Sequence, residues 1–276
     1  MKFYIESRYR SSGSNEDFVY QLPRGIDIPD SLAYIDCVCV PNTIYSIRQN
    51  TNDKLYIRES HISTSGGSPT ITYRVITLQP GQFNGVTLAA IVHTALNTGT
   101  TMPSYTVTFE LDQAKLKVVT SAANASSFII YGDVGLPSHW NSNAPTNLHI
   151  SGEHGSANKV CGFVSLQELT GNTTTPMIGS DVVDLQRHHV MYIHSDIGSP
   201  DASFGPQGES GIIRKVLVDA PQNGLAIDRH YTMYDSVDVA AQPLRSMRFS
   251  LRGSDAKLVD LHGHNWSFSI VFHEKL

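Results

Sequence analysis

The sequence has few cysteines and no long apolar run. Only three cysteines occur in 276 residues, Cys37, Cys39 and Cys161, and an odd number with one C-x-C pair neither makes a disulfide framework nor matches a zinc-binding spacing. No stretch approaches the roughly 20 apolar residues that a membrane-spanning helix needs. The charged first residues do not match a secretion signal. We therefore expect a chain that is made in a reducing compartment, is not secreted and does not span a membrane.

Charged residues are also scarce, at 16% of the chain, and they sum to a formal net charge of -5. A nucleic-acid-binding protein needs a basic surface to displace counterions from phosphates, so this composition argues against nucleic acid as a partner. The apolar fraction of 40% suffices for a sizeable core in a chain of this length. That fraction, with the low charge, is typical of a folded protein and not of a disordered one.

Motifs of catalysis are absent as well. No segment has the pattern of a nucleophile elbow, a phosphate-binding loop, a dinucleotide fold or a zinc protease helix, so we expect no enzymatic activity and no cofactor. One alternative is a cupin-like metal enzyme, since imidazole is a common metal ligand. Its candidate ligands are His188, His194, His262 and His264, although glycine-interrupted histidines fit a bulge at a sheet edge better.

What the sequence does contain is a series of about ten to twelve short strands separated by turn-forming residues. Residues 244–276 show the pattern most clearly, because apolar side chains alternate with polar ones in two segments. We predict that these two segments form a hairpin in the core. The side chains expected to face inward are Met247, Phe249, Leu251, Trp266, Phe268, Ile270 and Phe272.

One segment has helical periodicity instead. Residues 86–96 carry apolar side chains at helical spacings, followed by Asn97 and Gly99, which are typical of a helix end. Residues 132–180 lack a regular pattern, so we expect a loop-rich insertion there. Together these elements predict an all-β fold, a jelly-roll β-sandwich with long inserted loops and one short helix. We expect a single elaborated domain over residues 1–276, with two small β domains joined near residue 135 as the alternative.

Two groups of residues are candidate contact sites. Five arginines near the two ends of the chain suit ion pairs at an interface between subunits, namely Arg8, Arg10, Arg245, Arg248 and Arg252. Trp140 and His139 lie in the loop-rich stretch, where an exposed indole face would stack on a sugar ring. This pair supports an alternative function, a lectin-like β-sandwich that binds a glycan or a receptor.

Several segments resemble one group of virus proteins. They are FYIESRYR at residues 3–10, DFVY at 17–20, VPNTIYSI at 40–47, ITLQPGQF at 76–83 and VDLHG at 259–263. These segments are similar to penton and minor capsid proteins of eukaryotic double-stranded DNA viruses, of the Polinton-like virus and virophage type. The segments come from both ends and the middle, so the resemblance spans most of the chain.

The resemblance implies a structural protein of an icosahedral virion, with no catalytic residues to carry over. It implies a jelly-roll subunit that forms a cyclic homo-oligomer, a pentamer, at a vertex beside the major capsid protein and other capsid subunits. The chain is shorter than a double jelly-roll major capsid subunit, which agrees with a penton or minor role. Such a protein is made in the cytoplasm or nucleus of the host cell and ends in the capsid. A host receptor or glycan is a further expected partner.

Overall fold

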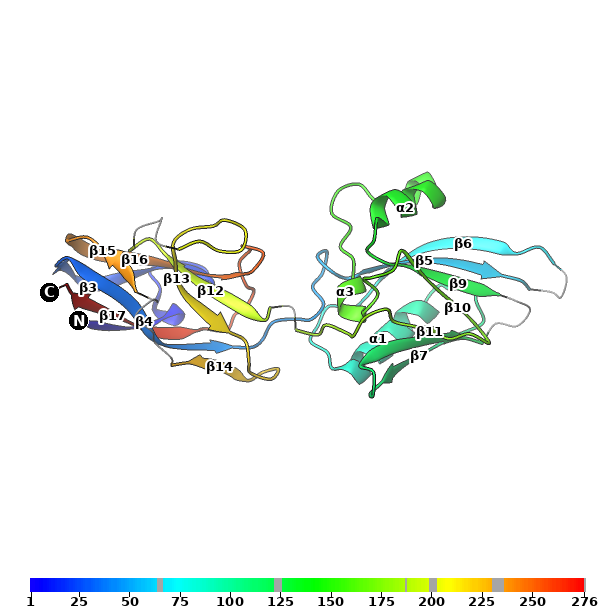
Figure 1. The fold of residues 1–276 in the computed structure, drawn as a ribbon, viewed down its shortest axis with the longest axis horizontal. Helices are drawn as coiled ribbons and strands as arrows, with labels where there is room; N and C mark the ends of the chain where they lie inside the picture. Colours follow the sequence, from blue (N-terminus) through cyan, green and yellow to red (C-terminus); the bar gives the residue numbers. More distant parts are fainter. Residues whose placement is uncertain (64–66, 122–125, 187, 199–202, 230–235, 276) are drawn as a thin grey trace. The chain divides into compact units, whose positions relative to one another are not determined.

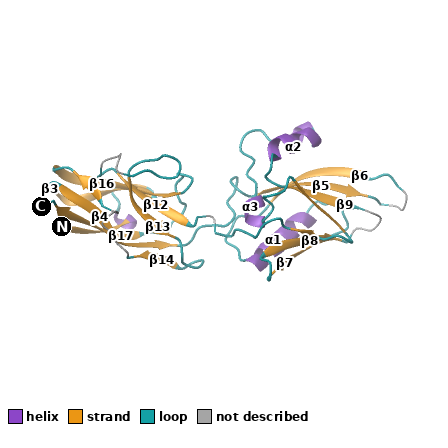
Figure 2. Ribbon diagram, in the orientation of Figure 1, coloured by secondary structure: helices purple, strands orange, loops and turns teal. Residues whose placement is uncertain are grey.

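The structure is a computed structural model that describes residues 1–63, 67–121, 126–186, 188–198, 203–229 and 236–275. It is built mainly of antiparallel strands (Figure 2), and the chain divides into two compact units. Unit 1 holds residues 1–44 and 188–276, and unit 2 holds residues 45–187. The chain thus leaves unit 1 after strand β4 (Ser31–Pro41) and resumes it at strand β12 (Val190–Ser195).

This division differs from the single domain expected from the sequence. Unit 2 is a continuous insertion of residues 45–187 with its own hydrophobic core, and no boundary falls near residue 135. The stretch 132–180 belongs to unit 2 and is less irregular than expected. It contains the helices α2 (Leu136–Asn143) and α3 (Asn158–Cys161), the 3-10 turn η2 (Thr146–Leu148) and the short strands β10 (Glu168–Asn172) and β11 (Met177–Ile178).

Unit 1 is a sandwich of two sheets. The first sheet has the order β1–β17–β4–β14, and β15 also pairs with β4. Its strands are β1 (Lys2–Glu6), β17 (Ser267–Glu274), β4, β14 (Leu225–Asp228) and β15 (Val237–Val239). The second sheet has the order β13–β12–β16–β3–β2, with β13 (Ile212–Leu217), β12, β16 (Gln242–Gly253), β3 (Asp17–Ile28) and β2 (Ser12–Gly13). The 3-10 turn η1 (Ser7–Tyr9) follows β1, and the first and last strands pair directly, blue beside red in Figure 1.

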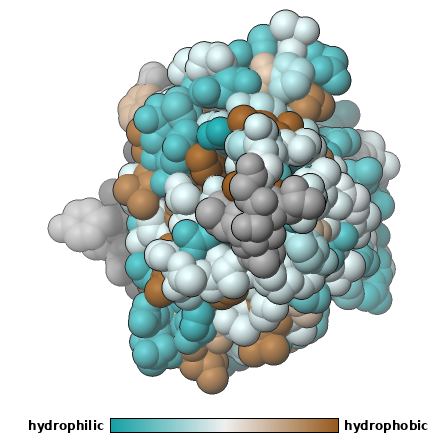
Figure 3. Space-filling view, turned by 90° about the vertical axis from the view of Figure 1, so that its right-hand side faces the viewer, coloured by the Kyte–Doolittle hydropathy of each residue, from teal (hydrophilic) through white to brown (hydrophobic). Residues whose placement is uncertain are grey.

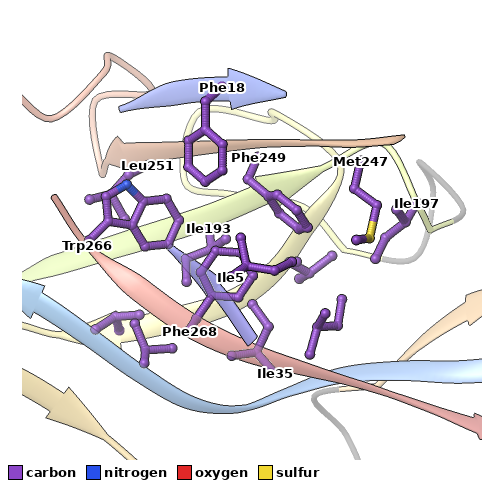
Figure 4. Packing of buried hydrophobic residues seen from close by; sticks show 14 of the residues in the cluster. Ile5, Phe18, Ile35, Ile193, Ile197, Met247, Phe249, Leu251, Trp266 and Phe268 are labelled. Atoms are coloured by element: carbon purple, nitrogen blue, oxygen red, sulfur yellow. The ribbon is translucent and has the colours of Figure 1, made fainter. Parts of the chain in front are cut away.

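The core of unit 1 lies between these two sheets (Figure 4). All seven side chains predicted to face inward near the end of the chain are buried there, because alternation sends every second side chain to one face of a strand. The ring of Phe249 lies 4.7 Å from that of Phe268, and Trp266 stacks on Phe268 at 4.9 Å. Aromatic pairs at these separations add to the stability gained from burial.

The predicted pairing of the two closing segments is wrong, although their inward residues are correct. β16 pairs with β3 and β12, whereas β17 pairs with β1 and β4. The two strands therefore belong to opposite sheets and meet through side chains across the core, not through a backbone ladder. Residues 254–266 carry the chain from one sheet to the other. A hairpin and such a crossing share the same alternation, so periodicity alone does not separate them.

Unit 2 also contains two antiparallel sheets. One has the order β10–β9–β5–β6, with β5 (Lys54–His61), β6 (Thr70–Thr77) and β9 (Ser127–Tyr131) beside β10. The other has the order β11–β8–β7, with β7 (Tyr105–Glu110) and β8 (Lys115–Thr120). Side chains from both sheets join those of helix α1 (Gly85–Asn97) in one core.

Helix α1 confirms the helical periodicity of residues 86–96. It begins with a capping box, because the amide of Thr87 donates to Asn84 Oδ1 and the amide of Asn84 donates to Thr87 Oγ1, each at 2.9 Å. Its apolar stripe is buried against β7. Among the described residues, no helix is both long and apolar enough to span a membrane.

Candidate functional site

The five arginines proposed as interface residues have different surroundings. Arg10 is engaged within its own loop, since its guanidinium donates to the carbonyls of Ser7 and Gly13 and to Asn15 Oδ1 at 2.6 Å. Arg252 likewise donates to Ser250 Oγ at 3.2 Å and to the carbonyl of Ala256 at 2.8 Å. These two side chains therefore tie local loops together, which uses much of their hydrogen-bonding capacity.

The other three arginines are more accessible. Arg248 makes a two-pronged ion pair with Asp17 on the neighbouring strand β3, at 2.8 and 2.7 Å, and its side chain is 59% exposed. This hydrogen-bonded pair lowers the pKa of Asp17. Arg8 lies 3.2 Å from Glu6 with its side chain 63% exposed, and Arg245 is exposed without an ion-pair partner among the described residues. A single exposed pair such as Arg8–Glu6 contributes only about 0–1 kcal/mol to stability, so Arg8 and Arg245 can engage a partner at little cost, whereas Arg248 is accessible but already bound to Asp17.

Arg248 and Arg252 share a cavity of about 280 Å³ on the outer face of the second sheet of unit 1. His194 and Ser195 of β12 lie in the same cavity, together with Asp196 and Glu209. His194 Nδ1 donates to the carbonyl of Ser210 at 3.1 Å. Burial lowers the pKa of His194, and the charge of Arg252 acts in the same direction. The imidazole is therefore neutral near pH 7.

The four histidines of the metal-enzyme alternative do not form a ligand set. His188 is buried beside Gly253, His194 lies in the cavity just described, and His262 lies in a turn with a φ of 51°. Across the part of the chain that the structure describes, no three His, Cys, Asp or Glu side chains are grouped so that they could hold a metal ion. The three cysteines are free thiols.

Trp140 does not present its ring to a ligand, so its expected role as a surface contact is wrong. It is fully buried in a second, smaller core on the other face of the β5–β9 sheet, where its ring meets Tyr56 and Tyr131 at 5.1 Å and Tyr73 at 5.7 Å. Its indole nitrogen donates to the carbonyl of Leu148 at 2.8 Å. His139 is partly exposed and lies 2.7 Å from Glu168. Composition marked this stretch as a loop, but helix α2 turns the indole toward the sheet.

Two acidic residues that the sequence analysis missed lie inside unit 2. Asp53 and Glu59 both have fully buried side chains. They alternate with Leu55 and Ile57, which are also fully buried, so the strand pattern places all four on one face. The alternation with Leu55 and Ile57, which indicates that both carboxylates face inward, was therefore present in the sequence. A charged side chain on an inward face is expected to have a compensating partner or a function.

The comparisons with known proteins give a match only in structure. No family model and no curated protein matches the sequence. The crystal structure of the mavirus penton protein, labelled with selenomethionine, matches with a TM-score of 0.54 and 9% sequence identity, over 100% of both chains. The chain shares the fold of this penton protein. A chain in the cryo-EM structure of the Sputnik virophage is similar with a TM-score of 0.48 and 13% identity, over 99% of this chain and 98% of that one.

The match to the mavirus penton protein covers both units, because no part of either chain is left out. The expected fold class, a mainly β jelly-roll sandwich, is confirmed. Unit 2 is therefore part of the shared fold and not an addition peculiar to this chain. At 9% identity the likeness concerns the fold, and residue roles have to be argued from this chain's own side chains.

Proposed function

We propose that this chain is a structural virion protein, a penton or minor capsid subunit without enzymatic activity. The observation that supports this proposal is the fold shared with the mavirus penton protein over the full length of both chains. On this proposal the protein acts by burying surface against neighbouring subunits. Its partners would be further copies of itself, the major capsid protein and other capsid subunits, and its place would be the capsid.

The edge strands of unit 1 offer one surface for such contacts. β13 ends one sheet and β14 ends the other, and the two strands contact each other. Leu217, Leu225 and Ile227 on these strands are 59%, 55% and 46% exposed. Edge strands with exposed apolar side chains are ready to pair or pack against another chain. We assign this edge of unit 1, defined by these three residues, as one half of a ring contact.

Arg8, Arg245 and Arg248 are the arginines left accessible for the complementary half. A ring of three or more copies uses two different surfaces on each copy, and the apolar edge and the arginines are the two surfaces that we assign to it. By contrast, the face drawn in Figure 3 shows brown, apolar residues only in small groups between teal and white ones.

The test is the mass of the purified protein in solution, measured by light scattering on a size-exclusion column. Five copies of the 30.3 kDa chain would weigh about 150 kDa as a closed ring. We expect this ring, and we expect Leu225→Asp to convert it to monomer. Leu111→Asp is the matched control, because Leu111 is 79% exposed in a turn of unit 2. A protein that stays monomeric at every concentration, with the same mass for both variants, would contradict self-assembly through this edge.

A further inference from the structure

Unit 2 has a groove of about 520 Å³ between strand β6 and helix α1. Residues 74–77 of β6 line one side, and Ile91, Thr94, Ala95 and the C-cap residue Thr98 of α1 line the other. β6 stands last in the sheet order β10–β9–β5–β6, so among the described residues one side of its backbone has no neighbouring strand. The groove therefore lies between an open sheet edge and a helix.

The register of β6 shows which of its backbone groups point away from β5. The amide of Leu78 donates to the carbonyl of Asp53 at 2.7 Å, and these two residues stand opposite each other because Thr77 pairs with Lys54. In an antiparallel ladder, hydrogen-bonded pairs alternate with pairs that are not hydrogen-bonded. The N–H and C=O groups of Val75 and Thr77 therefore point outward from the sheet edge, and both residues line the groove.

These outward groups are available to a partner. Outside the β5–β6 ladder, no hydrogen bond reaches the backbone of Val75 or Thr77 from any residue that the structure describes. The side chain of Val75 points to the opposite face of the sheet, where it lines a different cavity beside its pairing partner Tyr56. Val75 thus presents its backbone to the groove. The edge offers donors and acceptors two residues apart, a repeat of about 7 Å.

β6 also lacks the features by which edge strands usually avoid pairing. Its eight residues, TITYRVIT, contain no proline and no lysine, and its register with β5 shows no bulge. Its one charged residue, Arg74, bonds the buried carboxylate of Glu59 and the carbonyls of Leu96 and Thr98. A long and regular edge without protecting features is ready to accept another strand.

The helix side of the groove indicates which side chains such a strand carries. Helix α1 contains no Asp, Glu, Lys or Arg, and the charge of Arg74 is already compensated by Glu59. Ile91 and Ala95 are half-buried beside the core of unit 2. A charged side chain directed at this wall would lose its hydration without gaining a partner. Uncharged side chains, β-branched ones above all, suit both this wall and an extended backbone.

From these observations we propose that the groove between β6 and α1 binds an extended, uncharged peptide segment of a different protein, which adds to the sheet as a further strand. An extended peptide has N–H and C=O groups at the repeat that Val75 and Thr77 present. A second copy of this chain would bring its own α1 beside its own β6, so the two helices would obstruct a contact between the two edges. A segment without a fold of its own meets no such obstacle.

Peptide binding at this groove does not depend on the assembly function. Every residue that lines the groove lies within unit 2, whereas the ring contact proposed above lies at the edge of unit 1. A failure to bind peptides would leave the mass measurement unaffected, and the converse also holds.

The experiment begins with a displayed library of random peptides of about ten residues, the upper end of strand lengths, selected on the immobilised full chain. We expect enrichment of uncharged peptides rich in β-branched residues. Their affinity is then measured with synthetic copies by fluorescence anisotropy. Val75→Pro removes an outward N–H that β5 does not use, a change that edge strands tolerate, and it should weaken binding about tenfold. Val75→Ala keeps the backbone, so this matched control should leave the affinity nearly unchanged.

A second pair of variants keeps the test decisive if Val75→Pro misfolds. Thr94→Trp places a large ring in the groove and should weaken binding at least several-fold, whereas His93→Trp, at an exposed helix position outside the lining, should not. The proposal is overturned if no peptide is enriched, or if the selected peptides bind both groove variants as tightly as the wild type. It is also overturned if Val75→Pro lowers the mass of the protein in light scattering, because a second copy would then occupy the edge.

Discussion

We predict that the buried carboxylate of Glu59 stabilises unit 2. Its two oxygens accept five hydrogen bonds, from Thr100 Oγ1 at 2.7 Å, Thr101 N at 3.0 Å, Thr101 Oγ1 at 2.8 Å, Tyr105 Oη at 3.0 Å and the guanidinium of Arg74. These donors come from β6, β7 and the segment before β7, so Glu59 joins elements of both sheets.

Replacing Glu59 by Gln keeps the shape but turns one oxygen into an amide nitrogen. Whichever oxygen is lost, at least two donors then face an N–H group, and the charge of Arg74, whose side chain is only 11% exposed, is left uncompensated. Unpaired buried donors cost about 1–3 kcal/mol each, and breaking a buried ion pair costs about 3–5 kcal/mol. We therefore expect Glu59→Gln to destabilise unit 2 by about 3–5 kcal/mol, a drop of Tm on the order of 10 °C.

The assay is differential scanning calorimetry of the wild type and the variant, with Glu110→Gln as the control. Glu110 lies 3.6 Å from Lys117 in a partly exposed pair, so the control should change stability by less than about 1 kcal/mol. If Glu59→Gln cost no more than Glu110→Gln, the network around Glu59 would not stabilise the fold and this reasoning would be refuted.

The same site predicts a pH dependence. Burial alone raises the pKa of Glu59, but the hydrogen bonds from Thr101 and Thr100 and the charge of Arg74 outweigh it, so the pKa falls below its ordinary value of 4.5. A lowered folded-state pKa means that the stabilisation is present above pH 4.5 and is lost as the pH falls through the folded-state pKa. The stability difference between wild type and Glu59→Gln should therefore shrink at acidic pH, as measured by urea unfolding.

Two further outcomes are expected. Trp140→Ala should cost about 3–5 kcal/mol in urea unfolding, because the indole is fully buried, whereas His139→Ala should cost much less; similar small losses would contradict the burial of the indole. With a thiol reagent, the half-buried Cys37 and Cys39 should react before unfolding, and Cys161, whose pKa is raised by complete burial, only afterwards. Rapid reaction of all three thiols would contradict this placement.

Much of the local structure could be predicted from alternation alone. The inward faces of β16 and β17, the helix at residues 85–97 and most strand positions are set by side-chain polarity repeating every two or 3.6 residues. These patterns arise because each element must turn one face toward a core. The polarity of each residue therefore follows the face on which its side chain lies. Asp53 and Glu59 also follow it, although only the structure shows what surrounds their carboxylates.

Only the tertiary structure decided which elements meet. Phe249 and Phe268 face each other across a sandwich and not along a hairpin, and Trp140 turns inward because helix α2 lies against the β5–β9 sheet. The division at residues 44–45 and 187–188 likewise leaves no mark in composition. The pairing of strands, the burial of Trp140 and the division of the chain into two units all depend on contacts between residues far apart in the sequence. A local pattern is the same whichever of those contacts forms, so it does not determine them.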